Sequence, residues 1–230
     1  MKLGPHLVEA TFVVRLNRFA ALVLLDGAET LVHVPNSGRL RELFQPGNPV
    51  YLTPATSPAR KTRYSLSLVE VNGCLVSADA GAATAVAYEW LKEHLLPEFD
   101  GYTQVLREQT FGRSRIDLLL LGGEQKHYVE VKSATLVEDG VARFPDAPTA
   151  RGRKHVLELA EAVAQGHKAS VVFVVQRRDA EAFAPNDVAD PAFGEALRRA
   201  CAAGVHTYAY RCCVTLQEIT LDTGLPVILR

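Results

Sequence analysis

Two short segments place acidic and basic side chains in stretches that are otherwise apolar. Asp117 interrupts the run of Ile and Leu at residues 115–121, and Glu130 and Lys132 alternate with valines at residues 128–132. Side chains on a strand alternate between two faces, so Glu130 and Lys132 share one face and the valines point to the other. If the two segments are neighbouring strands, Asp117 can lie beside Glu130 across the pair. Two carboxylates and an ammonium group would then meet at one end of a hairpin.

Such a set of side chains suits the hydrolysis of a phosphodiester bond. Carboxylate oxygens are ligands that Mg²⁺ prefers, and this ion usually takes one or two of them and keeps several waters. A divalent cation withdraws charge from the scissile phosphate, and a nearby lysine can orient the attacking water. The sequence therefore predicts Asp117 and Glu130 as ligands of Mg²⁺ or Mn²⁺, and Lys132 as the residue that assists the water. Glu108, on the preceding strand, completes the predicted catalytic set.

A purely structural interpretation of these residues stays open. An Asp followed by Glu-x-Lys often occurs by chance, and an Asp117–Lys132 ion pair would explain the same pattern. Asp117 favours a functional site, because an unpaired carboxylate in an apolar strand is costly and is more often paired or metal-bound. The sequence has no G-x-x-x-x-G-K-[ST] loop, no G-x-G-x-x-G and no H-E-x-x-H, so nucleotide-triphosphate, dinucleotide and zincin sites have no support.

Basic side chains in two further regions are predicted to contact nucleic acid. Arg151, Lys154 and His155 crowd into the first turn of a predicted helix, where cations oppose the helix dipole. A bound phosphate would offset that repulsion and would accept hydrogen bonds from the free N–H groups of the turn. A solvated basic turn is the alternative. Four arginines of the first third are predicted to hold the strand: Arg15, Arg18, Arg39 and Arg41.

The elements that must position these residues divide the chain into two predicted domains. Residues 1–77 are rich in Val, Leu, Phe, Tyr and Thr. Strands are expected at 7–16, 19–25, 30–34, 50–53 and 64–71, with a short helix over 36–44. This order fits an all-β barrel of the OB type, which commonly binds oligonucleotides, and an SH3-like barrel remains an alternative.

Residues 78–230 are predicted to form an α/β domain. Helices are expected over 80–96, 151–165 and 191–203, and strands over 102–110, 115–121, 127–135, 169–175 and 205–210. The core order of helix, three strands, helix and strand is that of PD-(D/E)xK nuclease-like domains, although the order of elements alone does not establish chemistry.

Composition and charge are those of an ordinary globular protein. Formal net charge is −1, but the first 77 residues carry eight Lys or Arg against five acids, and the rest carry 17 against 21. The modestly basic first domain fits a nucleic-acid partner. The four cysteines form no C-x-x-C pair, and no apolar stretch is long enough for a signal peptide or a membrane span. A cytoplasmic location without membrane contact is therefore expected.

Several longer motifs resemble the bacterial and archaeal sugar fermentation stimulation protein family (SfsA), along essentially the whole chain. In chain order they are Arg15-x-x-Arg18-Phe19, His33-Val34-Pro35-Asn36-Ser37-Gly38, Gly112-Arg113-Ser114-Arg115-Ile116-Asp117, Tyr128-Val129-Glu130-Val131-Lys132-Ser133-Ala134-Thr135-Leu136, Phe144-Pro145-Asp146-Ala147 and Arg151-Gly152-x-Lys154-His155. Two departures are Thr84, where relatives often have Asn, and Asn36-Ser37-Gly38, where they often read Asn-Thr-Gly.

The resemblance implies an OB-type domain followed by a PD-(D/E)xK-type domain and an association with DNA. It also implies a link to the regulation of sugar utilisation, of maltose genes in particular. By position, Glu108, Asp117, Glu130 and Lys132 match the nuclease-type motif. A DNA-binding transcriptional regulator that keeps the nuclease fold without turnover is the alternative function. Since many nucleases of this fold act as pairs, a homodimer is a further expectation.

Overall fold

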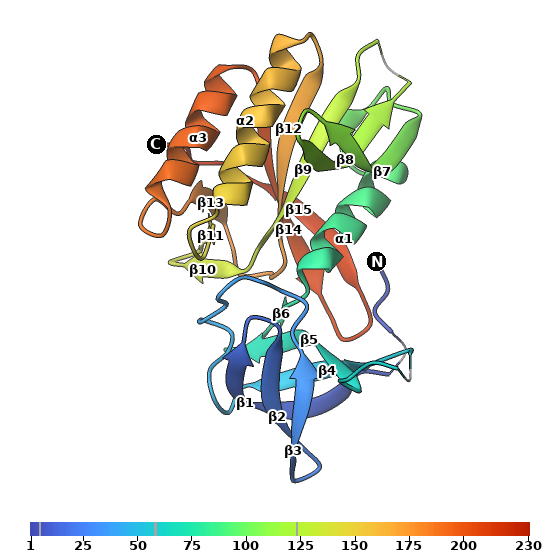
Figure 1. The fold of residues 1–230 in the computed structure, drawn as a ribbon, viewed down its shortest axis with the longest axis vertical. Helices are drawn as coiled ribbons and strands as arrows, with labels where there is room; N and C mark the ends of the chain where they lie inside the picture. Colours follow the sequence, from blue (N-terminus) through green and yellow to red (C-terminus); the bar gives the residue numbers. More distant parts are fainter. Residues whose placement is uncertain (5, 58, 123) are drawn as a thin grey trace.

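The first third of the chain forms a barrel that lies against one end of an α/β domain (Figure 1). The computed structural model describes residues 1–4, 6–57, 59–122 and 124–230. No helix in this described part of the chain is both long and apolar enough to cross a membrane.

The barrel consists of a strongly bent sheet with the strand order β3-β2-β1-β4-β5-β6. Its strands are β1 (Val8–Asn17), β2 (Ala20–Leu25), β3 (Ala28–His33), β4 (Pro49–Pro54), β5 (Tyr64–Val71) and β6 (Cys74–Ser77). A pairing of His33 with Ser65 joins β3 to β5 and closes the ring of the first five strands. Phe12, Leu52 and Leu66 fill its centre and are almost fully buried. The five predicted strands and the barrel are confirmed, and β6 is an addition.

The short helix expected after the third strand is wrong, because the structure has a loop with a single turn there. The guanidinium of Arg15 donates hydrogen bonds to the carbonyl oxygens of Asn36, Gly38 and Arg39 at 2.9, 2.6 and 2.7 Å. Leu40 has a φ of +50°, in the left-handed region. The guanidinium holds these carbonyl groups directed toward itself, and a left-handed residue interrupts a helix.

The α/β domain is built on a six-stranded sheet with the order β15-β14-β12-β9-β8-β7. Its main elements are α1 (Ala80–Lys92), β7 (Gln104–Phe111), β8 (Ser114–Leu121), β9 (His127–Ala134), α2 (Ala150–Ala164), β12 (Lys168–Val175), α3 (Pro191–Ala202), β14 (His206–Val214) and β15 (Ile219–Leu225). Strands β7, β8 and β9 are antiparallel, whereas β9, β12 and β14 run parallel. The predicted αβββαβ core is confirmed.

Helices cover both faces of this sheet. On one face α1 buries Val86 and Trp90 against the sheet, and on the other α2 and α3 bury Val156 and Phe193. Strand β12 lies between β9 and β14, and seven of its eight residues are buried. Such a buried and mainly apolar strand is typical of a parallel sheet covered on both sides. Helix α1 ends at Lys92, before the predicted end at residue 96, and Pro97 starts a short 3₁₀ helix (Pro97–Phe99).

The α/β domain also contains a small three-stranded sheet that was not expected from the sequence. It contains β10 (Leu136–Glu138), β11 (Val141–Phe144) and β13 (Ala182–Pro185). Phe144 anchors its end, with its ring centroid 5.5 Å from that of Phe173 and 5.1 Å from that of Phe193. Asp146 follows directly, and its Oδ2 accepts a hydrogen bond of 2.8 Å from the backbone N–H of Leu40 in the barrel. The small sheet therefore carries a carboxylate that binds the two domains together.

Candidate active site

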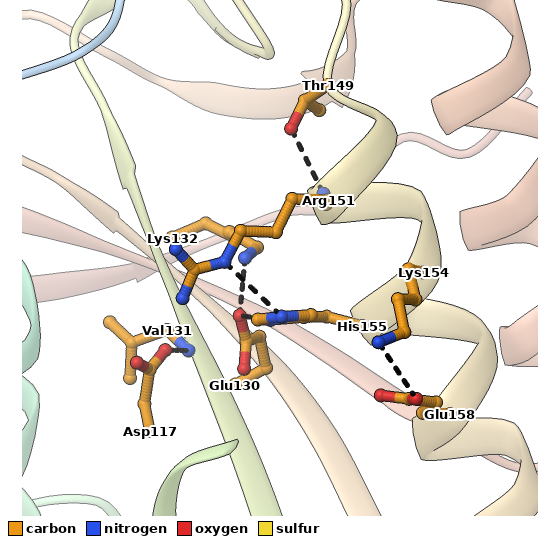
Figure 2. A network of polar contacts seen from close by, with 10 residues as sticks. Asp117, Glu130, Val131, Lys132, Thr149, Arg151, Lys154, His155 and Glu158 are labelled. Carbon is orange, nitrogen blue, oxygen red and sulfur yellow. Dashed lines mark hydrogen bonds and ion pairs between the residues drawn. The ribbon is translucent and has the colours of Figure 1, made fainter. Parts of the chain in front are cut away.

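The pairing of β8 with β9 brings the two central carboxylates together. Leu118 pairs with Val129, so the next position along the ladder sets Asp117 opposite Glu130. There the ladder ends, and Oδ2 of Asp117 accepts a hydrogen bond of 2.8 Å from the N–H of Val131 (Figure 2). The Asp117 side chain thus takes the place of a backbone acceptor at the point where the two strands separate.

Glu130 is the most enclosed group of the site, with 1% of its surface exposed. Its Oε1 lies 2.5 Å from Nζ of Lys132 and 2.5 Å from Nδ1 of His155. Its Oε2 is buried and has no hydrogen-bond partner among the residues that the structure describes. The ion pair in the structure is therefore Glu130–Lys132, in place of the Asp117–Lys132 pair considered as an alternative, and one carboxylate oxygen remains available to a ligand.

The two carboxylates differ in their electrostatic surroundings. Burial, and then the charge of Glu130, raises the pKa of Asp117 to about 6, and Lys132 offsets part of this effect. Burial alone would also raise the pKa of Glu130, but Lys132 and His155 outweigh it and hold this pKa below its ordinary value. At neutral pH both carboxylates are mainly ionised beside one lysine. This excess of negative charge in a buried place favours a bound cation.

The donor set fits a hard divalent cation that keeps part of its water shell. Among the residues that the structure describes, no three or more His, Cys, Asp or Glu side chains form a group that could hold a metal. A cation at this site would therefore have two protein ligands, Asp117 and Glu130. Two carboxylates with an unpaired oxygen match the one or two protein ligands that Mg²⁺ usually takes. They do not match the closed set of nitrogen and sulfur ligands of a structural zinc site.

Glu108 lies opposite Asp117 but points away from it. The pairs Arg107–Leu118 and Gln109–Ile116 of β7 and β8 set Glu108 across from Asp117. Its side chain is 62% exposed, and Oε1 lies 3.4 Å from Nη2 of Arg115. Its φ is +54°, a left-handed conformation that costs a non-glycine residue about 1–3 kcal/mol. The structure therefore does not bring this third predicted carboxylate to the other two.

The first turn of α2 supports Glu130 from behind. Thr149 caps the helix, and the buried His155 ring lies between Glu130 and Arg151. With the proton on Nδ1 the ring donates to Glu130, and its Nε2, 3.4 Å from Nε of Arg151, can accept (Figure 2). Lys154 stays at the surface, where Nζ donates to the carbonyl of Arg113 at 3.0 Å. Phosphate contacts by these residues stay a prediction, and the Glu130 contact of His155 was not foreseen.

Three adjacent hollows lie beside the site, and Lys132 and His155 are the residues of the site that line them. The interdomain cleft, of about 520 Å³, is lined by Arg18 and Leu40 from the barrel and by Lys132, Asp146 and Arg151 from the α/β domain. On the barrel side, Arg18 also lines the barrel groove with three of the predicted contacts, Arg15, Arg39 and Arg41. On the other side, Arg151 also lines the α2 groove with Arg113, Arg115, Lys154 and His155. Arg18 and Arg151 each line two of these hollows, so the basic surfaces of the two domains are continuous through the cleft that Lys132 lines.

The four predicted barrel arginines have different surroundings. Arg15 is committed to the chain itself, since its guanidinium also donates to the carbonyls of Asn17 and Arg18 at 3.1 and 2.6 Å. Arg18, Arg39 and Arg41 are exposed. Arg15 thus shapes the loop that bears its neighbours, and the other three have guanidinium groups accessible to a ligand.

Comparisons with known proteins agree with this architecture. A family model described as the SfsA N-terminal OB domain matches residues 13–78, and one described as the sugar fermentation stimulation protein RE domain matches residues 81–218. A sugar fermentation stimulation protein homolog from Thermoanaerobacter pseudethanolicus is 45% identical over 100% of both chains. One from Desulforamulus reducens is 44% identical over 97% of this chain and 93% of its own. The chain belongs to the sugar fermentation stimulation protein family.

A solved structure of this family shares the whole fold. It is described as Pyrococcus furiosus SfsA in complex with Ca²⁺, and it is 33% identical to this chain. The alignment covers 99% of this chain and 98% of that one, with a TM-score of 0.92. The family resemblance of the sequence motifs and the OB type of the barrel are confirmed.

Most of the SfsA motifs contribute residues to the interdomain cleft. Asn36 and Gly38 of one motif form the barrel wall of the cleft, and Asp146 of another faces them from the α/β domain. A Cβ atom added to Gly38 would lie 2.9 Å from Oδ2 of Asp146, so only glycine fits there without a shift. Sequence reasoning did not find Asp146, because its partner Leu40 is 106 residues away in the chain.

Proposed function

We propose that this SfsA-family protein binds nucleic acid, with DNA as the first candidate, and hydrolyses phosphodiester bonds with a bound Mg²⁺ or Mn²⁺. The observation that carries this proposal is the pair Asp117 and Glu130, with the unpartnered Oε2 of Glu130 and the ammonium group of Lys132 beside it. A buried carboxylate oxygen without a partner is costly, and a cation would remove that cost.

Each residue of the site has a definite part in the proposed reaction. Asp117 and Glu130 would hold the cation, which when bound withdraws charge from the scissile phosphate and makes a water more acidic. His155 fixes Glu130 through Oε1, so that Oε2 stays directed away from this contact. Lys132, with 13% of its side chain exposed, can orient the attacking water and stabilise the charge that develops on the phosphate.

The exposed basic residues would bind the substrate on both sides of this centre. Arg18, Arg39 and Arg41 would hold the phosphates on the barrel side, and Arg151 and Lys154 those on the other. We keep Glu108 as a proposed member of the set that acts only after its side chain leaves Arg115. The related Pyrococcus furiosus structure supports the choice of a divalent cation, since it is described as a complex with Ca²⁺, which also prefers oxygen ligands.

The test is cleavage of a labelled panel of single- and double-stranded DNA and RNA with Mg²⁺, Mn²⁺ or EDTA. We expect cleavage with either cation and none in EDTA, and we expect calorimetry with Mn²⁺ to show binding that Asp117→Asn removes. Lys168→Ala is the matched control, since this exposed lysine begins β12 at the end of the sheet away from Lys132. Cleavage that persists in EDTA, or that Asp117→Asn leaves unchanged, would overturn the metal-dependent mechanism.

Binding without cleavage across the whole panel would instead favour the regulator that uses this fold without turnover. The family's name links it to sugar fermentation, and a role in sugar metabolism through DNA binding is part of the proposal. The predicted homodimer is tested separately by the mass of the protein in solution, measured by light scattering.

A further inference from the structure

We propose that the substrate passes the site as a single strand, with one unpaired base stacked on the ring of Phe19. This inference rests on the proposed nucleic-acid function and specifies its substrate class. Phe19 lies in the turn between β1 and β2, one residue after Arg18. Arg18 lines both the barrel groove and the interdomain cleft, and Phe19 follows it in the same turn, so we place the stacked base where a strand would pass from one to the other.

Phe19 is exposed in a way that the other phenylalanines are not. Half of its surface, 50%, is open to solvent, and it is the only one of the nine phenylalanines among the large exposed apolar residues of the described chain. Its ring stacks on the imidazole of His33, with centroids 6.4 Å apart and planes 25° from parallel. His33 thus lies against the Phe19 ring, and half of the Phe19 surface stays accessible. An accessible ring of this kind is a surface on which a nucleobase can stack.

The backbone around Phe19 is fixed before any ligand binds. Its N–H donates to Oδ1 of Asn17 at 2.9 Å, and its carbonyl accepts from the N–H of Val34 at 2.9 Å. Nδ1 of His33 lies 3.1 Å from the same carbonyl oxygen. Since the turn is already ordered by these contacts, stacking a base on the ring costs little further backbone entropy.

An exposed aromatic ring and several basic groups lie close together here, a combination that suits a single strand. The ring of Phe19 can take a base, and the neighbouring guanidinium of Arg18 can take the adjoining phosphate. Arg39 and Arg41 continue the positive charge along the barrel groove. Proteins that bind single strands combine such a groove with aromatic rings, whereas duplex binding needs no unpaired base.

The form of the interdomain cleft also favours a single strand. Its two walls are bonded to each other, since the N–H of Leu40 donates to Asp146 across it at 2.8 Å. Gly38 packs so closely on Asp146 that no side chain fits between them. Lys132 lies on the α/β wall of this cleft, and the nearly buried Glu130 is bonded to it behind the wall. A single strand can bend its backbone into this narrow space, whereas a duplex presents a broad and stiff surface.

The test measures binding of the full-length protein in EDTA, so that cleavage plays no part. Fluorescence anisotropy would compare a labelled oligo(dT) with a blunt duplex of equal length. We expect tighter binding of oligo(dT), weakened about 5- to 150-fold by Phe19→Ala and retained in Phe19→Trp, from the usual contribution of one stacked base. Leu24→Ala is the matched control, since Leu24 is 43% exposed on the same barrel and lies at the far end of β2.

Phe19→Trp gives a second, direct signal. The natural chain has one tryptophan, Trp90, which is buried. A tryptophan at position 19 would be the exposed one, and oligo(dT) should quench its emission on stacking. Equal or tighter binding of the duplex, equal effects of Phe19→Ala and Leu24→Ala, no quenching, or no binding of oligo(dT) would each overturn the inference.

The experiments distinguish a failure of this inference from a failure of the proposed nuclease function. Phe19-dependent binding of oligo(dT) without cleavage in Mn²⁺ would leave this inference standing and remove the proposed nuclease activity. Cleavage of a duplex in Mn²⁺, with oligo(dT) binding that ignores Phe19, would leave the nuclease activity standing and remove this inference.

Discussion

The arginines of the barrel groove and the carboxylates of the α/β domain differ in their exposure to solvent. Arg18, Arg39 and Arg41 are exposed on loops and turns. Asp117 and Glu130 lie in or beside the core of the sheet, where burial and the charge of Glu130 raise the pKa of Asp117, and Lys132 and His155 outweigh burial and lower that of Glu130. Exposed charges act through screened and nearly independent contacts, whereas buried charges are coupled to one another. Changes in the groove should therefore be small and additive, and changes in the acidic pair large and specific.

The largest expected effect on activity is that of Asp117→Asn. Asparagine keeps an oxygen that can accept the hydrogen bond from Val131 but loses the charge that would hold the cation. We expect the cleavage rate with Mn²⁺ to fall at least about 100-fold, as when a main electrostatic contact of a transition state is removed. Single-turnover cleavage at saturating protein would measure this effect, and a loss below about fivefold would contradict the role of Asp117.

The same substitution should stabilise the metal-free protein. The raised pKa of Asp117, about 6 against an ordinary 3.8, means that the folded state binds the proton more tightly than the unfolded state does. The free energy of unfolding therefore falls as pH rises between about 4 and 6, by at most about 3 kcal/mol. Asp117→Asn should remove this fall. Urea unfolding in EDTA at several pH values would show it, and an unchanged pH dependence would contradict the buried state of Asp117.

An intermediate effect is expected for His155, which touches Glu130 but not the cleft. His155→Ala would leave Glu130 with Lys132 alone and would free its carboxylate to rotate. Loss of such a supporting contact usually lowers metal affinity or activity about 10- to 100-fold. Calorimetry with Mn²⁺ would measure the affinity, and circular dichroism would exclude unfolding. An effect on nucleic-acid binding with none on Mn²⁺ would instead favour His155 as a phosphate contact.

A smaller effect is expected for Arg39→Ala in the barrel groove. One exposed arginine contributes about one phosphate contact, so the slope of log K against log salt should fall by about one. Cleavage at saturating substrate should stay unchanged. Anisotropy titrations at several salt concentrations would measure the slope. A loss of cleavage at saturation would mean that the groove and the acidic pair are coupled after all.

The smallest effect is expected for Glu108→Gly, and it concerns stability. Glycine adopts the left-handed φ of +54° without strain, so the free energy of unfolding should rise by about 1 kcal/mol. If Glu108 acts in catalysis, cleavage should fall at the same time. Thermal unfolding and cleavage of the same preparation would test both, and a gain in stability with full activity would remove Glu108 from the site.

The difference between the two regions also explains what the sequence could reveal. Alternation along residues 128–132 and the short connection between two strands suffice to bring Asp117 beside Glu130, because both signals are local. The loop at residues 36–44 depends on Arg15, whose bonds to Gly38 and Arg39 span 23 and 24 residues. No local helix propensity contains that information, so the expectation of a helix failed.

The sequence could not predict the side-chain directions of Glu108 and His155 either. Strand order gave the position of Glu108 opposite Asp117, but its left-handed backbone, which turns the carboxylate toward Arg115, has no signal in the sequence. The position of His155 in the helix is compatible with an exposed ring or with a buried one. Only the packing of α2 on β9 decides that it faces Glu130.

The measurement that tests the central claim most directly is cleavage and binding by Lys132→Ala in parallel. If the acidic pair and Lys132 form a catalytic centre, cleavage with Mn²⁺ should fall at least about 100-fold. Binding of the same substrate in EDTA should change by less than about threefold, since one partly buried lysine adds little to a track of exposed arginines. Full cleavage by Lys132→Ala, or a loss of binding as large as the loss of cleavage, would contradict the assignment of this centre.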